Sequence, residues 1–447
     1  MLIFGLLQSL YHGSSKRVKK FVDETIYSYS VLKISTPDHS CFLILVCFVF
    51  HYKYTCRNMK IRAAVLEQMG KPLPYSVSKP LTIQELDLEG PEEDEVLVKM
   101  WYVGLCHSDL SVINGSRPRP TPMVLGHEAM GQVLQIGPGV DNVSVGDLVS
   151  CIFVPGCGQC EGCRIGRPTT CIPGAEANKR GVLLCGKTHL FRTRAPEKQP
   201  VYHMGGTSGF ATHAVLSKHS VIKVDPSMPP QYAALLGCGV ITGVGAVTNS
   251  AKVTFGSTVA IVGLGGVGLC GLLGAKACGA SLILAVDLEE QKLAKAKEFG
   301  ATHTYRVQKK DSLSKTVENI CQLIGPFHKG LDYAFEMAGN GPALQIAYGI
   351  TKPGGTTVTI GLPDPAVDLN IQQVSITAEE RTLIGSYLGS GVAVRDLPRY
   401  VELYKKGVLP LEKLVSGIIP LNQINEGFDM LEKGEVIRIL VNLKDEN

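Results

Sequence analysis

The stretch Ser257-Thr-Val-Ala-Ile-Val-Gly-Leu-Gly-Gly-Val-Gly268 decides the fold of this chain. Its first half is a short apolar run that predicts a buried strand, and a helical pattern covers Val267–Gly279 directly after it. The glycines between the two have separate roles. Gly263 permits the tight turn, Gly265 lets the backbone approach a pyrophosphate, and Gly268 allows the helix to pack closely on the strand. Because the start of a helix also favours a negatively charged ligand, the stretch predicts a dinucleotide-binding turn.

An acidic residue follows the turn at the spacing that such a site needs. Asp287 ends the next predicted strand, Ser281–Asp287, 19 residues after Gly268. A carboxylate there can accept hydrogen bonds from both hydroxyls of an adenosine ribose. Because the same charge repels a 2′-phosphate, the sequence favours NAD over NADP.

Strand and helix patterns then alternate along the chain. Alternation of strands with helices of about 10–15 residues indicates a doubly wound parallel sheet. We predict strands at 331–336 and 356–361, and helices at 289–299, 313–324, 341–350, 401–406 and 424–433. Upstream, short strands separated by Gly and Pro turns are predicted, among them Val96–Val103 and Gly131–Ile136. We therefore predict an α/β fold, with a Rossmann domain at 240–387 and a mainly β catalytic domain formed by 59–239 and 388–447.

The first 58 residues differ from the rest of the chain. They hold seven Lys or Arg and three acids, which accounts for the whole net charge of +4, so the neutral remainder argues against a nucleic-acid partner. The apolar run Cys41–Phe50 is too short to span a bilayer. The basic residues at 16–20 follow the apolar start and make a poor signal peptide. We expect a cytoplasmic protein with an N-terminal extension at 1–58, and three interpretations of that extension stay open: a membrane address, an organelle address, or an over-long gene model.

Four cysteines form a cluster with the spacing of a metal site. Cys157, Cys160, Cys163 and Cys171 follow one another at steps of three, three and eight. Thiolates at these steps can surround one ion tetrahedrally, and four sulfurs leave no open position, which describes a structural zinc site. In a long chain with room for a large core, such C-x-x-C clusters more often bind metal than form disulfides.

A second set of ligands is spread over distant segments. Cys106, His127 in a Gly-His-Glu triplet, and Cys238 between two glycines each offer one donor. Two thiolates and one imidazole leave a fourth position for water or a substrate oxygen, as in a catalytic zinc site. Asp109 and Glu128 stand beside these ligands, and we expect them to orient an imidazole or modulate the metal. The sequence thus predicts two Zn²⁺ per chain and a zinc-dependent dehydrogenase.

One further motif has the letters of a phosphate loop without its context. Gly181-Val-Leu-Leu-Cys-Gly-Lys-Thr188 matches the Walker A pattern, which requires a strand before it and a helix after it. The residues before it, Ile172–Arg180, and the Arg- and Pro-containing residues after it predict an irregular surface loop. We therefore expect no phosphate site there.

With these motifs in place, the chain closely resembles the zinc-containing, medium-chain alcohol dehydrogenases from about Lys60 to Leu443. The resemblance implies a GroES-like catalytic domain, NAD, catalytic zinc on Cys106, His127 and Cys238, and structural zinc on the four-cysteine cluster. The long stretch between Cys171 and Cys238 is more like that of the dimeric animal and plant enzymes. A homodimer is therefore expected, with a tetramer as the alternative, and a small alcohol or aldehyde as the substrate.

The resemblance also implies roles for the remaining site residues. Ser108, two after Cys106, is expected to accept a hydrogen bond from the substrate hydroxyl and pass its proton to the NAD ribose. Phe153 is expected to form an aromatic wall of the substrate pocket. The implied NAD contacts are Asp287 and Lys292 on the adenosine ribose, Arg438 and His107 on the pyrophosphate, Thr242 and Val267 on the nicotinamide, and Gly263, Gly265, Gly266 and Gly268 in the turn.

Three positions depart from well-known branches of the family. Ser111 stands where many relatives have the histidine that ends the proton relay. Ala175 and Arg117 replace an arginine and an acid of the glutathione-dependent formaldehyde branch, which argues against hydroxymethylglutathione as the substrate.

The sequence favours an NAD-dependent alcohol and aldehyde oxidoreductase over three other functions. A polyol or other secondary-alcohol dehydrogenase is the alternative within the superfamily, although such enzymes often have a carboxylate where Cys238 stands. A zinc protein that binds nucleic acid would need a basic lobe, and residues 151–171 contain only Arg164 and Arg167 as cations, against Glu161. A redox sensor with oxidisable thiols could coexist with catalysis.

Overall fold

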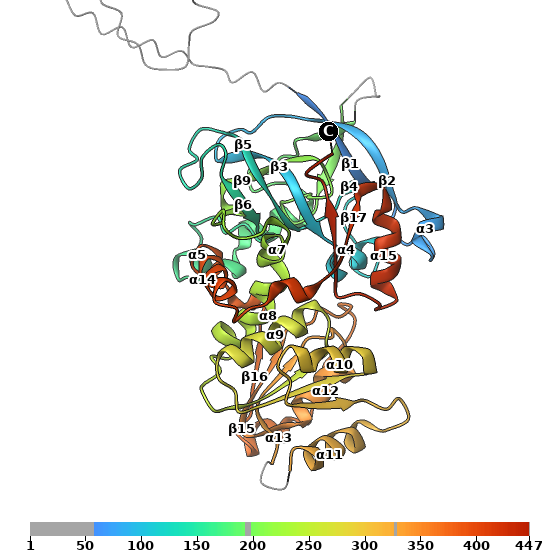
Figure 1. Ribbon diagram of the computed structural model, residues 1–447, viewed down its shortest axis with the longest axis vertical. Coiled ribbons are helices and arrows are strands. Elements are labelled where there is room, and N and C mark those ends of the chain that lie inside the picture. The colour runs from blue at the N-terminus through green and yellow to red at the C-terminus, as the bar shows by residue number, and fades with distance from the viewer. Residues whose placement is uncertain (1–57, 193–197, 326–328, 447) are drawn as a thin grey trace, which may run out of the picture. The chain divides into compact units, whose positions relative to one another are not determined.

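The glycine turn lies at the carboxyl end of an inner strand of a six-stranded parallel sheet in the computed structural model (Figure 1). The strand order is β13-β12-β11-β14-β15-β16, which is the 3-2-1-4-5-6 order of the Rossmann fold. The predicted doubly wound sheet is therefore confirmed. Its strands are β11 (Thr258–Val262), β12 (Leu282–Asp287), β13 (His303–Arg306), β14 (Leu331–Glu336), β15 (Thr351–Thr359) and β16 (Thr382–Gly385). Its helices are α9 (Gly266–Ala277), α10 (Glu290–Glu298), α11 (Leu313–Leu323), α12 (Gly341–Gly349) and α13 (Gln373–Ala378).

The structure describes residues 58–192, 198–325 and 329–446, all of which belong to one unit of the chain. The predicted extension, apart from Asn58, lies outside the described residues, so its three interpretations stay open.

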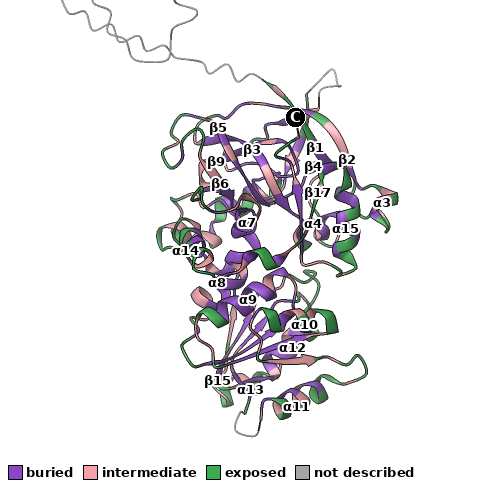
Figure 2. Cartoon of the chain, viewed as in Figure 1, coloured by how far each residue is buried: buried purple, intermediate pink, exposed green. Residues whose placement is uncertain are grey.

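Burial explains the apolar sequence of the central strand. Every residue of β11 is buried, because helices cover both faces of the parallel sheet (Figure 2). The glycine-rich helix α9 is also mostly buried and packs on β11. This packing fixes the position of the turn that joins them.

The remaining strands form two further sheets. One is a closed barrel, in the order β1 (Met59–Leu66), β2 (Leu81–Leu88), β7 (Leu190–Arg192), β8 (Gln199–His203) and β4 (Met123–Val124). The other has the order β10 (Val221–Lys223), β6 (Leu148–Cys151), β5 (Glu128–Ile136), β3 (Glu95–Gly104), β18 (Arg438–Asn442) and β17 (Val415–Pro420), with β9 (His213–Ser217) also paired to β3. Because β18 pairs with β3, the end of the chain returns to the first part of the fold. The strands thus divide among the predicted segments 59–239, 240–387 and 388–447, while the exact domain boundaries stay a prediction.

Short helices connect these sheets. They are α3 (Tyr75–Ser78), α4 (His107–Ile113), α5 (Glu161–Arg164), α6 (Ile172–Arg180), α14 (Ala393–Lys405) and α15 (Ile424–Glu432), with single turns at η1 (Pro168–Thr170), η2 (Lys218–Ser220), η5 (Leu388–Ser390), η6 (Leu411–Leu414) and η7 (Leu421–Gln423). Helix α6 corrects the prediction of an irregular loop at Ile172–Arg180. Pro173 lies in the first turn of this helix, where proline is tolerated because its missing N–H is not needed there. The Walker-like stretch therefore follows a helix and precedes strand β7, the reverse of the order that a phosphate loop requires.

A helical segment that the sequence did not predict links the catalytic part to the Rossmann sheet. It runs through α7 (Pro230–Ala233), the π turn η3 (Leu236–Val240), α8 (Ile241–Gly245) and a second π turn, η4 (Ala246–Ser250). Pro230–Ser250 is long and apolar enough to span a bilayer by length and composition, but 83% of its most apolar window is buried within the protein. Its apolar character is thus that of a core helix.

Candidate active site

The three predicted ligands of the catalytic set meet at one point. Cys106 precedes α4, His127 precedes β5, and Cys238 lies in the π turn η3. Cys238 Sγ lies 4.0 Å from Cys106 Sγ and 3.3 Å from His127 Nε2. All three side chains are at least 95% buried. Three donor atoms from distant segments therefore converge in the interior, and π turns occur often at functional sites.

The second nitrogen of His127 faces a buried acid. Asp109 lies in α4, is fully buried, and places Oδ1 3.2 Å and Oδ2 3.1 Å from His127 Nδ1. Its Oδ1 also accepts the backbone N–H of Gly126. A proton held on Nδ1 by this carboxylate leaves the lone pair of Nε2 directed at the two sulfurs. This is the orienting contact expected for an imidazole that binds metal.

The charges of the set favour a cation. The hydrogen bond with Cys238 lowers the pKa of Cys106 well below its ordinary value, while that contact and burial raise the pKa of Cys238. Burial would lower the pKa of His127, but the charges of Asp109 and Cys106 raise it well above the ordinary value. Two sulfurs and an imidazole with an oriented free lone pair are donors that zinc prefers. Cys106, His127 and Cys238 therefore fit a zinc ion. Binding of zinc would release the protons that these side chains hold without it.

Glu128 forms an ion pair on the other side of the ligand set. Its Oε2 accepts a hydrogen bond of 2.9 Å from Arg438 Nε, and its Oε1 accepts the backbone N–H of Gly239. Arg438 Nη2 in turn lies 3.8 Å from Cys106 Sγ. Burial raises the pKa of Glu128 to about 7, against the opposing charge of Arg438. This pair was not anticipated, since the sequence placed Arg438 only on the pyrophosphate.

The four-cysteine cluster also forms as expected from its spacing. The Sγ atoms of Cys157, Cys160, Cys163 and Cys171 all lie within 4.8 Å of one another. Backbone N–H groups point at the sulfurs: that of Cys157 at Cys171 Sγ (3.2 Å) and that of Cys160 at Cys157 Sγ (3.3 Å). The N–H of Cys163 lowers the pKa of Cys160 to about 6, whereas burial raises the pKa of Cys163 to about 12. Four sulfurs this close can all be thiolates only with a cation to balance their charge, which fits a structural zinc.

The glycine turn has the geometry of a dinucleotide cradle. Gly263 has φ +96°, a conformation that side chains disfavour, and a Cβ on Gly268 would lie 1.9 Å from the Gly263 carbonyl oxygen. Gly265 is the N-cap residue of α9, and no side chain caps this end of the helix. A Cβ added to Gly265 would meet no atom within 4 Å. Open space therefore adjoins the first N–H groups of α9, where a pyrophosphate could bind. Asp287 lies beside the turn, because its Oδ2 accepts the N–H of Leu264 at 2.8 Å.

The other predicted coenzyme residues are linked to this turn through Arg438 and through helix α9. Desolvation lowers the pKa of the His107 imidazole; the charge of Cys106 opposes this effect, and the charges of Arg438 and Lys292 add to it. A Cβ on Gly266 would lie 2.6 Å from Arg438 Nη1. Helices α8 and α9 are in contact, which brings Thr242 and Val267, one on each helix, to the same part of the fold.

Aromatic side chains border the ligand set. The ring of Phe153 makes an edge-to-face contact with His127, with centroids 5.1 Å apart, and a second one with Tyr387, 6.1 Å apart. Tyr387 was missed because it comes from the far end of the Rossmann segment, where no motif marks it. Ser108 is half-buried at the second position of α4. The hydroxyl of Ser111 donates to the His107 carbonyl, so it is engaged with the backbone.

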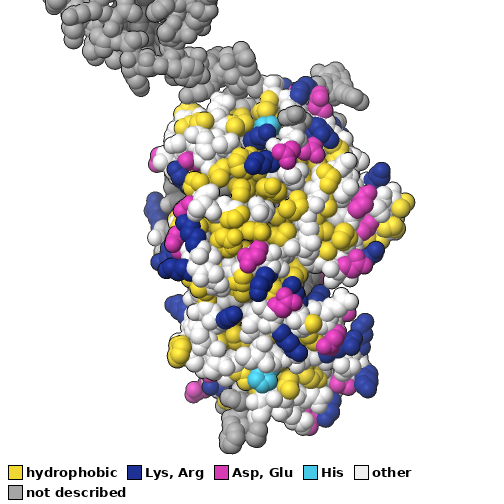
Figure 3. Space-filling model, viewed as in Figure 1, with side chains coloured by type: hydrophobic (Ala, Val, Ile, Leu, Met, Phe, Trp, Pro, Cys, Tyr) yellow, Lys and Arg dark blue, Asp and Glu magenta, His cyan; other side chains and the backbone are white. Residues whose placement is uncertain are grey.

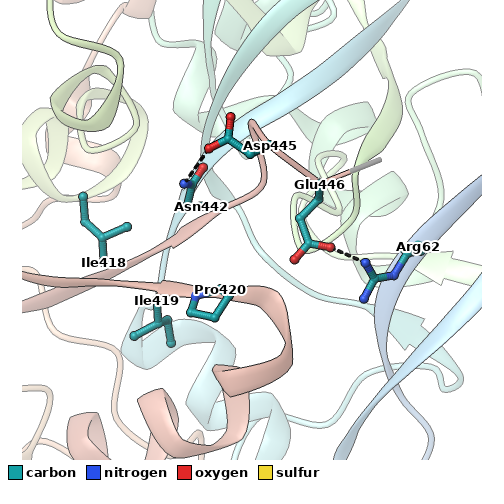
Figure 4. A pocket seen from close by; sticks show the side chains of 7 residues that line it. All are labelled: Arg62, Ile418, Ile419, Pro420, Asn442, Asp445 and Glu446. Atoms are coloured by element: carbon teal, nitrogen blue, oxygen red, sulfur yellow. Dashed lines mark hydrogen bonds and ion pairs between the residues drawn. The ribbon is translucent and has the colours of Figure 1, made fainter.

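A separate hollow of about 500 Å³ opens between β1, β17 and β18 (Figure 4). Its lining is Arg62, Ile418, Ile419, Pro420, Asn442, Asp445 and Glu446. Arg62 is paired with Glu446 at 2.5 Å, and no predicted site residue lines the hollow.

On the face drawn in Figure 3, cationic and acidic side chains are interspersed, without a broad field of one sign among the described residues.

Comparison with known proteins points to one family. Residues 92–226 match the alcohol dehydrogenase GroES-like domain, and residues 266–406 match the zinc-binding dehydrogenase domain. An alcohol dehydrogenase zinc-binding domain protein from Burkholderia ambifaria is 32% identical, with a TM-score of 0.78 over 86% of this chain and 99% of that one. Benzyl alcohol dehydrogenase from Acinetobacter calcoaceticus is also 32% identical, with a TM-score of 0.77 and the same coverage. Acetophenone reductase from Geotrichum candidum, in complex with NAD, is 26% identical, with a TM-score of 0.67 over 87% of this chain and 98% of that one.

Proposed function

Because the chain belongs to the zinc-containing, medium-chain alcohol dehydrogenase family, we propose that it interconverts alcohols and aldehydes or ketones by hydride transfer to and from NAD. One observation supports this proposal: Cys106, His127 and Cys238 converge, with Asp109 on the far nitrogen of the imidazole and with Arg438 reaching from Cys106 to Gly266 of the glycine turn. We also propose one zinc ion on this set and a second on the four-cysteine cluster. The free thiols of the described residues fit a reducing compartment such as the cytoplasm.

The side chains divide the work of the reaction. Zinc bound to this set would supply Lewis acidity, which makes an alcohol hydroxyl easier to deprotonate. The nicotinamide supplies the hydride chemistry. Asp109 keeps the imidazole of His127 in the tautomer that binds metal. Ser108 accepts the proton of the substrate hydroxyl and passes it on, while Phe153 and Tyr387 exclude water from the reacting carbon.

The position of Ser111 changes the last step of proton release. Relatives with a histidine at this place have a titratable group there, whereas the Ser111 hydroxyl is bonded to a backbone carbonyl. In this chain the proton therefore passes from Ser108 and the coenzyme ribose to water or to another residue, without a histidine at the end of the relay.

The aromatic side chains support an aromatic alcohol as the first substrate to test. Phe153 and Tyr387 offer ring edges and faces next to the ligand set, and the benzyl alcohol dehydrogenase is among the relatives that are 32% identical. The reductase that acts on acetophenone keeps the secondary-alcohol alternative open. A screen of primary, secondary and aromatic alcohols with NAD, together with zinc analysis, tests the proposal. Turnover with NADP but not NAD, or a chain without zinc, would contradict it. The homodimer stays a prediction.

Removal of the Asp287 charge is expected to weaken the preference for NAD. The wild type should prefer NAD over NADP in kcat/KM by about 100-fold, since an uncompensated like-charge contact costs several kcal/mol. Asp287→Asn keeps an acceptor for the Leu264 N–H and loses only the charge, so the ratio should narrow to about 10-fold. Steady-state kinetics with both coenzymes measures it. An unchanged ratio in Asp287→Asn would show that another group selects the coenzyme.

Truncation of Phe153 is expected to change substrate preference and leave the metal in place. Phe153→Ala removes the ring between His127 and Tyr387, so kcat/KM for benzyl alcohol should fall by about 10-fold, while that for ethanol changes little. Phe153→Leu, which keeps most of the apolar volume, is the matched control and should lose less. Equal losses for both alcohols would place Phe153 outside the substrate pocket.

A further inference from the structure

A third group of metal-binding side chains lies outside both zinc sites. Glu95, Cys185 and His189 bring a carboxylate oxygen, a sulfur and an imidazole nitrogen within 4.8 Å of one another. Glu95 begins strand β3, whereas Cys185 and His189 come from the Walker-like stretch and the residue that follows it. None of these residues belongs to the proposed catalytic or structural set.

The buried members of this group have unused polar atoms. Glu95 and His189 are only 2% and 1% exposed. His189 Nε2 lies 2.9 Å from Glu95 Oε2, yet neither ring nitrogen of His189 has a hydrogen-bond partner of good geometry, and neither does Glu95 Oε1. Buried polar atoms without partners are costly, so their presence calls for an explanation such as a bound ion.

The loop holds Cys185 at the entrance of the group. The turn is fixed by two backbone bonds, from Leu183 N–H to the Lys187 carbonyl and from Gly186 N–H to the Leu183 carbonyl. Cys185 at its tip is exposed, so an ion can reach the sulfur from solvent. The ammonium of Lys187 points to Glu92 Oε2 at 2.6 Å, where it is engaged by an acid and is not free to hold a phosphate.

The charges of the group suit a divalent cation. Burial would raise the pKa of Glu95, but the close imidazole of His189, 2.9 Å away, holds that pKa below the ordinary value, which favours the carboxylate form. Burial and the nearby carboxylate raise the pKa of Cys185 to about 11. An ion would therefore displace the thiol proton, after which a carboxylate and a thiolate balance its two charges.

We propose that Glu95, Cys185 and His189 form a third cation site, for Zn²⁺ or a metal of similar preference. Sulfur, imidazole nitrogen and carboxylate oxygen are the three donor types that zinc takes from proteins, and solvent at Cys185 supplies the fourth ligand. The ion ties the 181–189 loop to the start of β3, the strand that leads to Cys106. Its role is structural, because the site stands apart from the substrate and coenzyme residues.

Zinc content of the full chain tests this site. Cys185→Ser removes the one exposed ligand and leaves the buried pair intact, so the variant is expected to fold and to contain one zinc ion per chain fewer than the wild type, with kcat within about twofold. Cys321→Ser, on α11 and outside every metal-binding group of the described residues, is the control and should keep the wild-type content. In protein stripped by mild chelation, added Zn²⁺ should raise the melting temperature more for the wild type than for Cys185→Ser.

The outcomes separate this site from the two others. Equal zinc content in the wild type and Cys185→Ser overturns the proposal. Loss of a zinc ion together with loss of turnover in Cys185→Ser also overturns it, because the missing ion then belongs to the catalytic set. If Cys185→Ser contains one zinc ion fewer than the wild type and keeps its turnover, the result supports the third site, whatever the total zinc content of the wild type is.

Discussion

Cys106→Ser is expected to lower kcat by at least about 1,000-fold while the chain stays folded, because the loss of a thiolate ligand removes or misplaces an ion whose Lewis acidity contributes several kcal/mol to the barrier. The zinc content should fall by one ion per chain. The melting temperature should change little, since the ligand set is surrounded by a large core.

The matched control is Cys278→Ser. This half-buried cysteine follows α9 and belongs to none of the metal-binding groups. It should keep both zinc and turnover. Normal kcat in Cys106→Ser, or an equal loss in both variants, would contradict the assignment of the catalytic set.

Cys160→Ser is expected to give the reverse pattern, with a large loss of stability. Because a closed four-cysteine site forms only in the folded chain, the free energy of metal binding adds to the free energy of folding. In small zinc domains this contribution is of the order of 10 kcal/mol. Even a fraction of this should lower the apparent melting temperature by about 10 °C. The protein that remains folded should retain most of its kcat per molecule, because no residue of the cluster belongs to the catalytic set.

Thermal unfolding and active-site titration on the same sample measure the two effects separately. Glu161→Gln, on the exposed surface of the same lobe, is the control and should leave the melting temperature unchanged. If Cys160→Ser abolished turnover without any change in melting temperature, the roles of the two zinc sites would have to be exchanged.

Where the signal is local, the sequence was sufficient to predict the fold. The helix after the glycine turn was predicted at 267–279 and runs over Gly266–Ala277, and the strand at 331–336 has the predicted bounds. Both elements depend on short-range periodicity and on glycines whose geometry is set by their immediate neighbours. The three donors of the catalytic set could also be named, because each lies in a short motif.

Long-range and context-dependent features could not be predicted. Glu128 and Arg438 are 310 positions apart, and no spacing rule encodes their ion pair. Tyr387 reaches Phe153 only because the chain leaves the Rossmann sheet at that point. The helical segment 230–250 was not predicted, and its glycines allow close contacts between distant parts of the chain, such as that of Gly237 with the Cys151 carbonyl. In each case tertiary packing overrides the local signal.

In the proposed enzyme, the buried guanidinium of Arg438 would make the binding of zinc and the binding of NAD thermodynamically dependent on each other. It contacts the acid beside the metal ligands, approaches the sulfur of Cys106, and lies against Gly266 in the dinucleotide turn. Any coenzyme that draws this cation toward its phosphates alters the field at the sulfur. Reciprocity of linkage then requires that the metal alter coenzyme affinity by the same factor as the coenzyme alters metal affinity.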